Sequence, residues 1–160
     1  MRGARLACIT SFCLCIGLVL TTAGCAAKRL PQLVEVEGQV LLDGEPLPKA
    51  AIEFVPELAD FGAQYNSRAI TDDEGHFKLV CGKSQEPGAV IGKHRVVVRD
   101  FTPPQLRGRS EEDQTKLAEY FENLKNRPIP EIYGSMGKTP LRIEITPEQK
   151  SYTVWLTSAK

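Results

Sequence analysis

The sequence predicts an all-β protein, a seven-stranded antiparallel sandwich, from three observations. Short segments alternate between apolar and polar side chains, as strands with one face in a core do. Turn-forming residues such as Asp43-Gly44 and Asp72 to Gly75 separate these segments. Beyond the N-terminal region, a single segment shows helical spacing. Many short strands with frequent turns are typical of a sandwich rather than an α/β fold.

The expected strands are bounded by turns and prolines. The first spans 34–42 and ends at the turn Asp43 to Pro46, and the second spans 51–55 and ends at Pro56. The others are 68–71, 76–80, 93–99, 141–145 and 152–156. Alternation places these side chains in the core: Val34, Val36, Leu141, Ile143, Ile145, Val154 and Leu156.

One inserted helix, about 110–126, interrupts the strand pattern within an insertion that spans 103–128. Ser110 is a good N-cap, acidic residues follow it in the first turn, and Asn126 and Pro128 end the helix. One apolar stripe recurs at helical spacing: Leu117, Tyr120, Phe121 and Leu124. This stripe either covers a face or an edge of the sheet or binds a partner.

The N-terminal residues 1–24 have the layout of a signal peptide. Arg2 and Arg5 precede an uncharged apolar run that is short for a membrane span, and small residues follow it. The stretch Thr22-Ala23-Gly24-Cys25 resembles the lipobox of bacterial lipoproteins. That resemblance implies cleavage between Gly24 and Cys25, a diacylglyceryl group on the Cys25 thiol and a fatty acid such as palmitate on the new amino terminus. An uncleaved anchor and ordinary signal-peptidase cleavage are the alternatives.

The cysteines fit this interpretation. Three of the five lie in the removed segment, so that Cys25 and Cys81 remain in the mature chain. A lipidated Cys25 cannot form a disulfide, and we expect Cys81 to be buried as a small apolar residue behind Leu79-Val80. Residues 25–32 form a lipidated tether, and 33–158 form the domain.

Three segments of this domain resemble a carboxypeptidase regulatory-like domain: Glu37 to Leu47, Ala51 to Pro56, and Ala69 to Phe77. Gly92 to Val98 is similar to a later strand of that family, with His94 where an aromatic residue is usual. The resemblance implies a transthyretin/Ig-like sandwich. It implies no reaction, because a fold does not specify a function.

Charge and residue inventory argue against several functions. The formal net charge is zero, and removal of Arg2 and Arg5 leaves the chain slightly acidic, so we expect no nucleic-acid partner. His76 and His94 are the sole histidines, and no spacing suggests a nucleophile with its base. The turn Asp72 to Gly75 offers too few oxygens for Ca²⁺. We therefore expect no enzyme activity, no cofactor and no metal, a hydrolase being the less favoured alternative.

The expected function is that of a non-catalytic cell-envelope lipoprotein, at the periplasmic or outer-membrane face, held to the membrane by its lipid. Its sandwich would bind or scaffold envelope proteins or glycans. The alternative is a carrier of carbohydrate or another small molecule, with an aromatic site lined by Phe61, Tyr65, Phe101 and Tyr133.

Overall fold

The computed structural model describes residues 31–58 and 62–158. The expected signal peptide 1–24, Cys25, the tether up to residue 30 and Phe61 lie outside the described residues. Pro31–Lys160 form one compact unit with its own hydrophobic core. Among the described residues, no helix combines the length and apolar character needed to cross a bilayer.

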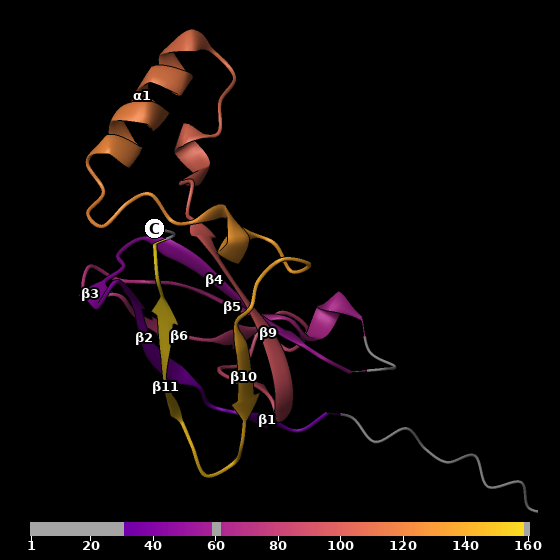
Figure 1. The fold of residues 1–160 in the computed structure, drawn as a ribbon. Coiled ribbons are helices and arrows are strands. Elements are labelled where there is room, and N and C mark those ends of the chain that lie inside the picture. The colour runs from indigo at the N-terminus through magenta and orange to yellow at the C-terminus, as the bar shows by residue number, and fades with distance from the viewer. Residues whose placement is uncertain (1–30, 59–61, 159–160) are drawn as a thin grey trace, which may run out of the picture. The chain divides into compact units, whose positions relative to one another are not determined.

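The described chain is mostly β-sheet with one α-helix, as predicted (Figure 1). The longer strands are β2 (Glu37–Leu42), β4 (Ala50–Pro56), β5 (Ser67–Ile70), β6 (His76–Lys78), β9 (Gly92–Asp100), β10 (Arg142–Ile145) and β11 (Ser151–Leu156). Four further strands have two residues each: β1 (Leu33–Val34), β3 (Glu45–Pro46), β7 (Val80–Cys81) and β8 (Ala89–Val90). Short 3₁₀ helices are η1 (Ala63–Tyr65), η2 (Pro104–Leu106) and η3 (Glu131–Gly134). Each of the seven expected segments contains a strand.

Two main sheets enclose the core. The larger sheet has the order β10-β9-β4-β5-β7 and is antiparallel throughout. The smaller sheet has the order β11-β2-β3, with β6 also paired to β2. β1 and β8 form a separate two-stranded sheet. Buried side chains of both sheets meet in one cluster, which includes Val40, Leu42, Phe77, Val154 and Leu156 from the smaller sheet and Ile52, Phe54, Val96, Val98 and Ile145 from the larger.

The smaller sheet departs from the antiparallel expectation, because β11 runs parallel to β2 with Trp155 opposite Leu41. Alternation of side chains is the same in both directions, so the sequence pattern does not distinguish them. Gly38 permits this pairing at its start. A Cβ on Gly38 would stand 1.9 Å from the backbone oxygen of Tyr152 and 2.8 Å from the Phe77 ring.

The expected strand 76–80 is divided between the two sheets at Leu79. His76 to Lys78 pair with β2, whereas Val80-Cys81 pair with β5. Leu79 itself is fully buried, and its backbone N–H donates to the carbonyl of Val36 at 2.9 Å. The crossing thus places a leucine side chain in the core at the point where the chain changes sheets. Cys81 is buried as expected, packed with Tyr65 and Val90.

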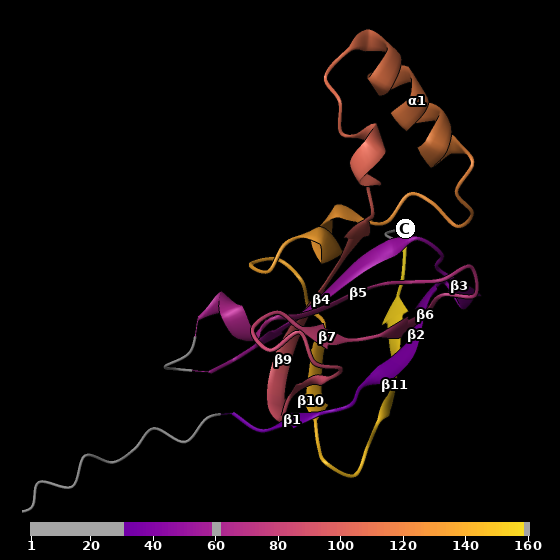
Figure 2. The same cartoon turned by 180° about the vertical axis from the view of Figure 1, so that it is seen from behind.

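The inserted helix α1 (Glu111–Glu122) begins at its expected cap. The Ser110 hydroxyl accepts from the backbone N–H of Asp113, and the Asp113 carboxylate accepts from the backbone of Ser110, a complete capping box. The helix ends at Glu122, earlier than the expected 126. Figures 1 and 2 show α1 beyond the ends of the strands, next to η2, rather than over a face of either sheet. It has no buried residue.

Candidate functional site

The outward side of the smaller sheet carries polar, charged and apolar side chains. Register places them in three rows across the strands: Ser151 with Glu37 and Lys78, Thr153 with Gln39 and His76, and Trp155 with Leu41 and Pro46. Their neighbours along each strand point into the core, as the buried Tyr152, Val154 and Leu156 of β11 illustrate. We call these nine residues the outer face.

Trp155 dominates one end of the outer face. Its side chain is 60% exposed, although Trp is ordinarily well covered by neighbours. The partly exposed Leu41 and Pro46 extend its apolar surface across the strands. In the adjacent row, Thr153 and Gln39 supply uncharged hydrogen-bonding groups, and the Gln39 amide already donates to the carbonyl of Glu74 at 2.8 Å. An apolar platform thus lies beside polar groups.

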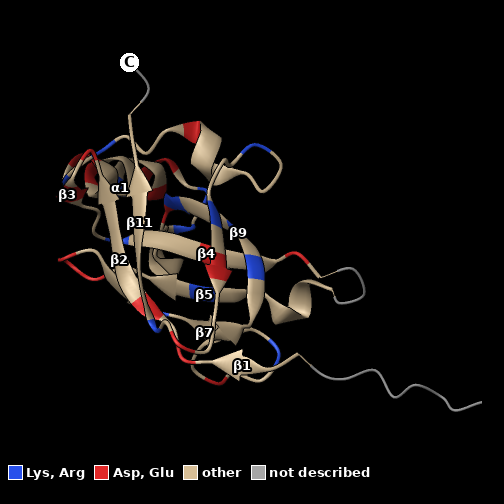
Figure 3. Ribbon diagram, turned by 60° about the horizontal axis from the view of Figure 1, so that its bottom comes forward, with Lys and Arg blue, Asp and Glu red and all other residues tan. Residues whose placement is uncertain are grey.

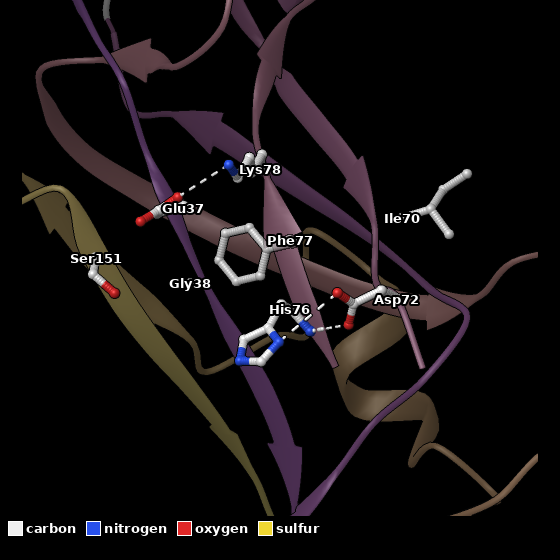
Figure 4. A pocket seen from close by; sticks show the side chains of 8 residues that line it. All are labelled: Glu37, Gly38, Ile70, Asp72, His76, Phe77, Lys78 and Ser151. Atoms are coloured by element: carbon white, nitrogen blue, oxygen red, sulfur yellow. Dashed lines mark hydrogen bonds and ion pairs between the residues drawn. The ribbon is translucent and has the colours of Figure 1, made fainter. Parts of the chain in front are cut away.

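A hollow of about 650 Å³ opens at the other end of the outer face. Figure 4 shows its lining, with Phe77 between β2 and β6, and with Ile70 and Asp72 entering from the β5 side. Lys78 Nζ lies 3.6 Å from Glu37 Oε2 across the sheet. The Asp72 carboxylate accepts from the backbone N–H groups of Glu74 and His76, which fixes the turn before β6.

The hollow contains a serine, a histidine and an aspartate, but not in a catalytic arrangement. His76 Nδ1 lies 3.8 Å from Asp72 Oδ2, beyond hydrogen-bonding distance. Ser151 is on β11 and His76 on β6, with β2 between them, which separates their backbones by about 10 Å. A nucleophile and its base need direct contact. This group of residues therefore offers hydrogen bonds and charge rather than an activated nucleophile.

His94 is in the core and not in the hollow. It is fully buried, its Nδ1 lies 3.0 Å from the carbonyl of Gly92, and its ring packs against Phe54 with centroids 5.9 Å apart. Burial lowers the pKa of His94, although the Gly92 carbonyl and Glu57 oppose that effect. Nε2 has no hydrogen-bond partner among the described residues. His94 thus occupies the place of an aromatic core residue.

The aromatic residues expected to line a ligand site lie in different surroundings. Tyr65 is buried with Cys81 in a small cluster, and Lys83 donates to its hydroxyl at 2.7 Å. Tyr133 is buried in the main core, and its hydroxyl accepts from the backbone N–H of Thr157 at 3.1 Å. Phe101 lines a separate hollow on the larger sheet. The structure therefore does not bring these three together, and Phe61 lies outside the described part of the chain.

The stripe on the insertion is half-buried at all four positions, Leu117, Tyr120, Phe121 and Leu124. Tyr120 and Phe121 contact each other, with ring centroids 5.4 Å apart. Since α1 does not lie over a face of either sheet, the stripe does not cover a sheet face, and coverage of a sheet edge stays a prediction. Partner binding by the stripe stays a prediction.

The acidic side chains of the turn Asp72 to Gly75 form contacts within the protein. Asp73 pairs with Lys49 at 2.8 Å, and Asp72 accepts from its own turn. Within the described residues, no three His, Cys, Asp or Glu side chains are grouped so as to hold a metal ion.

Trp155 is the functional candidate that sequence reasoning missed, although a signal was present. Val154 and Leu156 were expected in the core, and alternation then directs Trp155 outward. The rows around it depend on the pairing of β11, β2 and β6, which residue spacing does not reveal. Comparisons of the chain with protein-family models, curated proteins and solved structures found no match.

Proposed function

We propose that this chain is a non-catalytic cell-envelope lipoprotein whose β domain, a transthyretin/Ig-like sandwich with seven longer strands, of the carboxypeptidase regulatory-like type, binds envelope glycans through the outer face. One observation carries the binding function: the chain's single Trp, Trp155, stands 60% exposed on a sheet face beside uncharged polar side chains. A monomeric protein gains nothing in folding from leaving so large an apolar side chain in water. Such exposure suits a ligand that covers the ring.

The chemistry of the outer face favours a sugar as that ligand. A pyranose ring has an apolar face of C–H groups, which packs on an aromatic ring, and a rim of hydroxyls, which needs donors and acceptors. Trp155 and Leu41 supply the apolar surface for the C–H face, and Thr153 and Gln39 supply donors and acceptors for the hydroxyls. The rows run across three strands, about 10 Å from β11 to β6, which spans about two sugar units.

The separation of Ser151 from His76, with β2 between their strands, supports a binding function without catalysis. Basic and acidic residues are interspersed along the strands (Figure 3). This distribution suits a partner held by local contacts rather than one attracted by an electrostatic potential of a single sign. A carrier of small molecules is the second candidate. The hollow of about 370 Å³ beside Phe101 on the larger sheet favours it.

The proposed location in the cell envelope rests on the sequence before residue 31. Its test is the intact mass of protein purified from its native membrane, compared with a Cys25→Ala variant. We expect the mass of residues 25–160 plus a diacylglyceryl group and a fatty acid, and we expect the variant to lose this addition. An unlipidated or uncleaved chain would contradict this location.

The binding function is tested by sedimentation of the chain with insoluble envelope polysaccharide. Trp155→Ala should raise the dissociation constant at least about tenfold, the cost of about 1.4 kcal/mol of stacking. Met136→Ala is the matched control, because Met136 is 51% exposed but is not part of the outer face. Equal retention of both variants would exclude the outer face as the binding surface.

A further inference from the structure

A second hollow, of about 370 Å³, lies on the outward side of the larger sheet. Register places Ala51 of β4 between Ile70 of β5 and Arg99 of β9. The next row across the same strands is Arg68, Glu53 and Val97. Ala51 has the smallest side chain of its row, so it leaves a depression between two long neighbours, and Phe101 adds an aromatic wall.

Two arginines border this hollow, and one carboxylate orients both. Arg68 donates to Glu53 Oε1 from Nε at 2.9 Å and from Nη2 at 2.7 Å. Arg99 donates to Glu53 Oε2 from Nη2 at 3.0 Å, and Asn66 donates to Oε1 at 2.8 Å. The Glu53 side chain is 12% exposed, so it is held in place by four hydrogen bonds at the base of the two guanidinium groups.

Within the described part of the chain, the guanidinium groups of Arg68 and Arg99 donate to Glu53 only. A guanidinium has five N–H groups, of which Arg68 uses two on Glu53 and Arg99 uses one. Their side chains are 66% and 56% exposed. Two positive charges face one negative charge, so the group of three carries a net charge of about +1. Room therefore remains for one more anionic oxygen pair.

The rest of the lining is apolar. Ile70 is 47% exposed, which is unusual for a large aliphatic side chain on a strand, and Ala51 and Phe101 lie beside it. An ion alone would leave this apolar surface in water. A ligand with a charged end and an apolar body would cover it and gain about 25 cal/mol per Å² of apolar surface removed from water.

We infer that this hollow binds a small organic monocarboxylate with a compact apolar body, the carboxylate on Arg68 and Arg99 and the body over Ala51 between Ile70 and Phe101. One carboxylate neutralises the net charge of the Arg68–Glu53–Arg99 group, and its planar oxygens match a guanidinium fork. The site shares none of the nine residues of the outer face, although Ile70 also borders the hollow at the end of that face, and it does not depend on glycan binding.

The test is a titration of residues 31–160, which form a compact unit with its own core, with phenylacetate, followed by amide chemical shifts. Phenylacetamide and acetate are the companion probes, because the first lacks the charge and the second lacks the apolar body. We expect saturable shifts at β4, β5 and β9 with phenylacetate and at least about tenfold weaker binding of either companion. Equal binding of phenylacetamide or of acetate would overturn the inference.

Three variants assign the contacts. Arg99→Gln should weaken phenylacetate binding about tenfold by removing a charge-assisted donor, and Ala51→Leu should weaken it similarly by filling the depression while both arginines remain. Arg142→Gln is the control, since Arg142 is an exposed arginine of the same sheet that faces Glu57 instead. Full binding by Ala51→Leu, or equal loss in Arg142→Gln, would contradict the site. Trp155→Ala should bind phenylacetate as the parent chain does.

Discussion

The side-chain amide of Asn126 donates to the backbone carbonyl of Leu42, 84 positions earlier in the chain, at 3.0 Å. The same amide donates to the carbonyl of Glu45 at 3.1 Å. Asn126 therefore joins the end of the helical insertion to the turn between β2 and β3. Its neighbour Arg127 strengthens this junction by donating to the carbonyl of Pro48 at 2.6 Å and by pairing with Asp100.

Replacement of Asn126 should destabilise the whole domain rather than the helix alone. Glycine adopts the observed φ of +57° at this position without strain, so Asn126→Gly removes the side-chain amide alone. We expect a loss of about 1–2 kcal/mol in the free energy of unfolding. Urea denaturation followed by circular dichroism measures this. Asn123→Gly is the comparison, because the Asn123 amide donates within the insertion, to Glu119 at 2.8 Å. Equal losses in both would argue against the junction.

Removal of the helix cap should act locally. Ser110→Ala breaks the capping box and should cost α1 about 1 kcal/mol, but α1 contributes no buried residue to the core. We expect faster amide hydrogen exchange across 111–122 with an unchanged midpoint of global unfolding. A lowered global midpoint would show that the insertion folds as one unit with the sandwich.

The buried hydroxyl of Thr71 is predicted to be sensitive to replacement. Its Oγ1 accepts from the backbone N–H of Ala50 at 2.8 Å and donates to the carbonyl of Leu47 at 2.7 Å, with the side chain fully buried. Thr71→Val keeps the shape and leaves both backbone groups unpaired, which should cost about 2–4 kcal/mol. Thr71→Ser retains the hydroxyl, and its thermal midpoint should lie much closer to that of the parent. Similar midpoints for the Val and Ser variants would refute this role.

Stability should fall as the pH drops below about 6.5. Burial lowers the pKa of His94 from its ordinary 6.5, so below that pH the unfolded chain binds a proton that the folded chain does not. The free energy of unfolding therefore decreases until the pH passes the folded pKa. Between pH 6.5 and 5, His94→Phe should flatten this dependence, since an aromatic ring can still pack against Phe54. A full slope retained in His94→Phe would contradict the assignment of this pH dependence to His94.

The sequence pattern was sufficient for the seven longer strands and for the start of the helix, because both depend on local chemistry. It missed two short strands, β3 within the expected turn Asp43 to Pro46 and β8 at Ala89–Val90. Alternation located β4, β9 and β11, and Ser110 located the cap. The parallel pairing of β11 with β2 could not be predicted, because side-chain alternation is the same for parallel and antiparallel strands. The relative direction of two strands depends on how they come together around the core. The crossing at Leu79 was missed for the same reason: a strand that continues in the other sheet has the same alternation as one that does not.

The candidate sites were harder to predict, because the register between paired strands decides which side chains lie next to one another. The outward direction of Trp155 could be predicted from its core-facing neighbours Val154 and Leu156. Its position beside Leu41 follows from the pairing of strands more than 100 positions apart in the chain. Tyr65 and Tyr133 show the opposite case. Both are in loop segments that suggested exposure, yet their rings are buried and their hydroxyls are hydrogen-bonded. Aromatic content in a loop was thus a poor guide to a ligand site.

The central claim, that the outer face binds a glycan, is tested most directly by the fluorescence of Trp155. It is the single tryptophan of the chain, so its emission reports on that face alone. Soluble envelope oligosaccharides should shift the emission to shorter wavelength and reduce its quenching by iodide, because a stacked sugar excludes water from the ring. Binding of these oligosaccharides by calorimetry with unchanged Trp155 emission would contradict the account, and so would the absence of any binding.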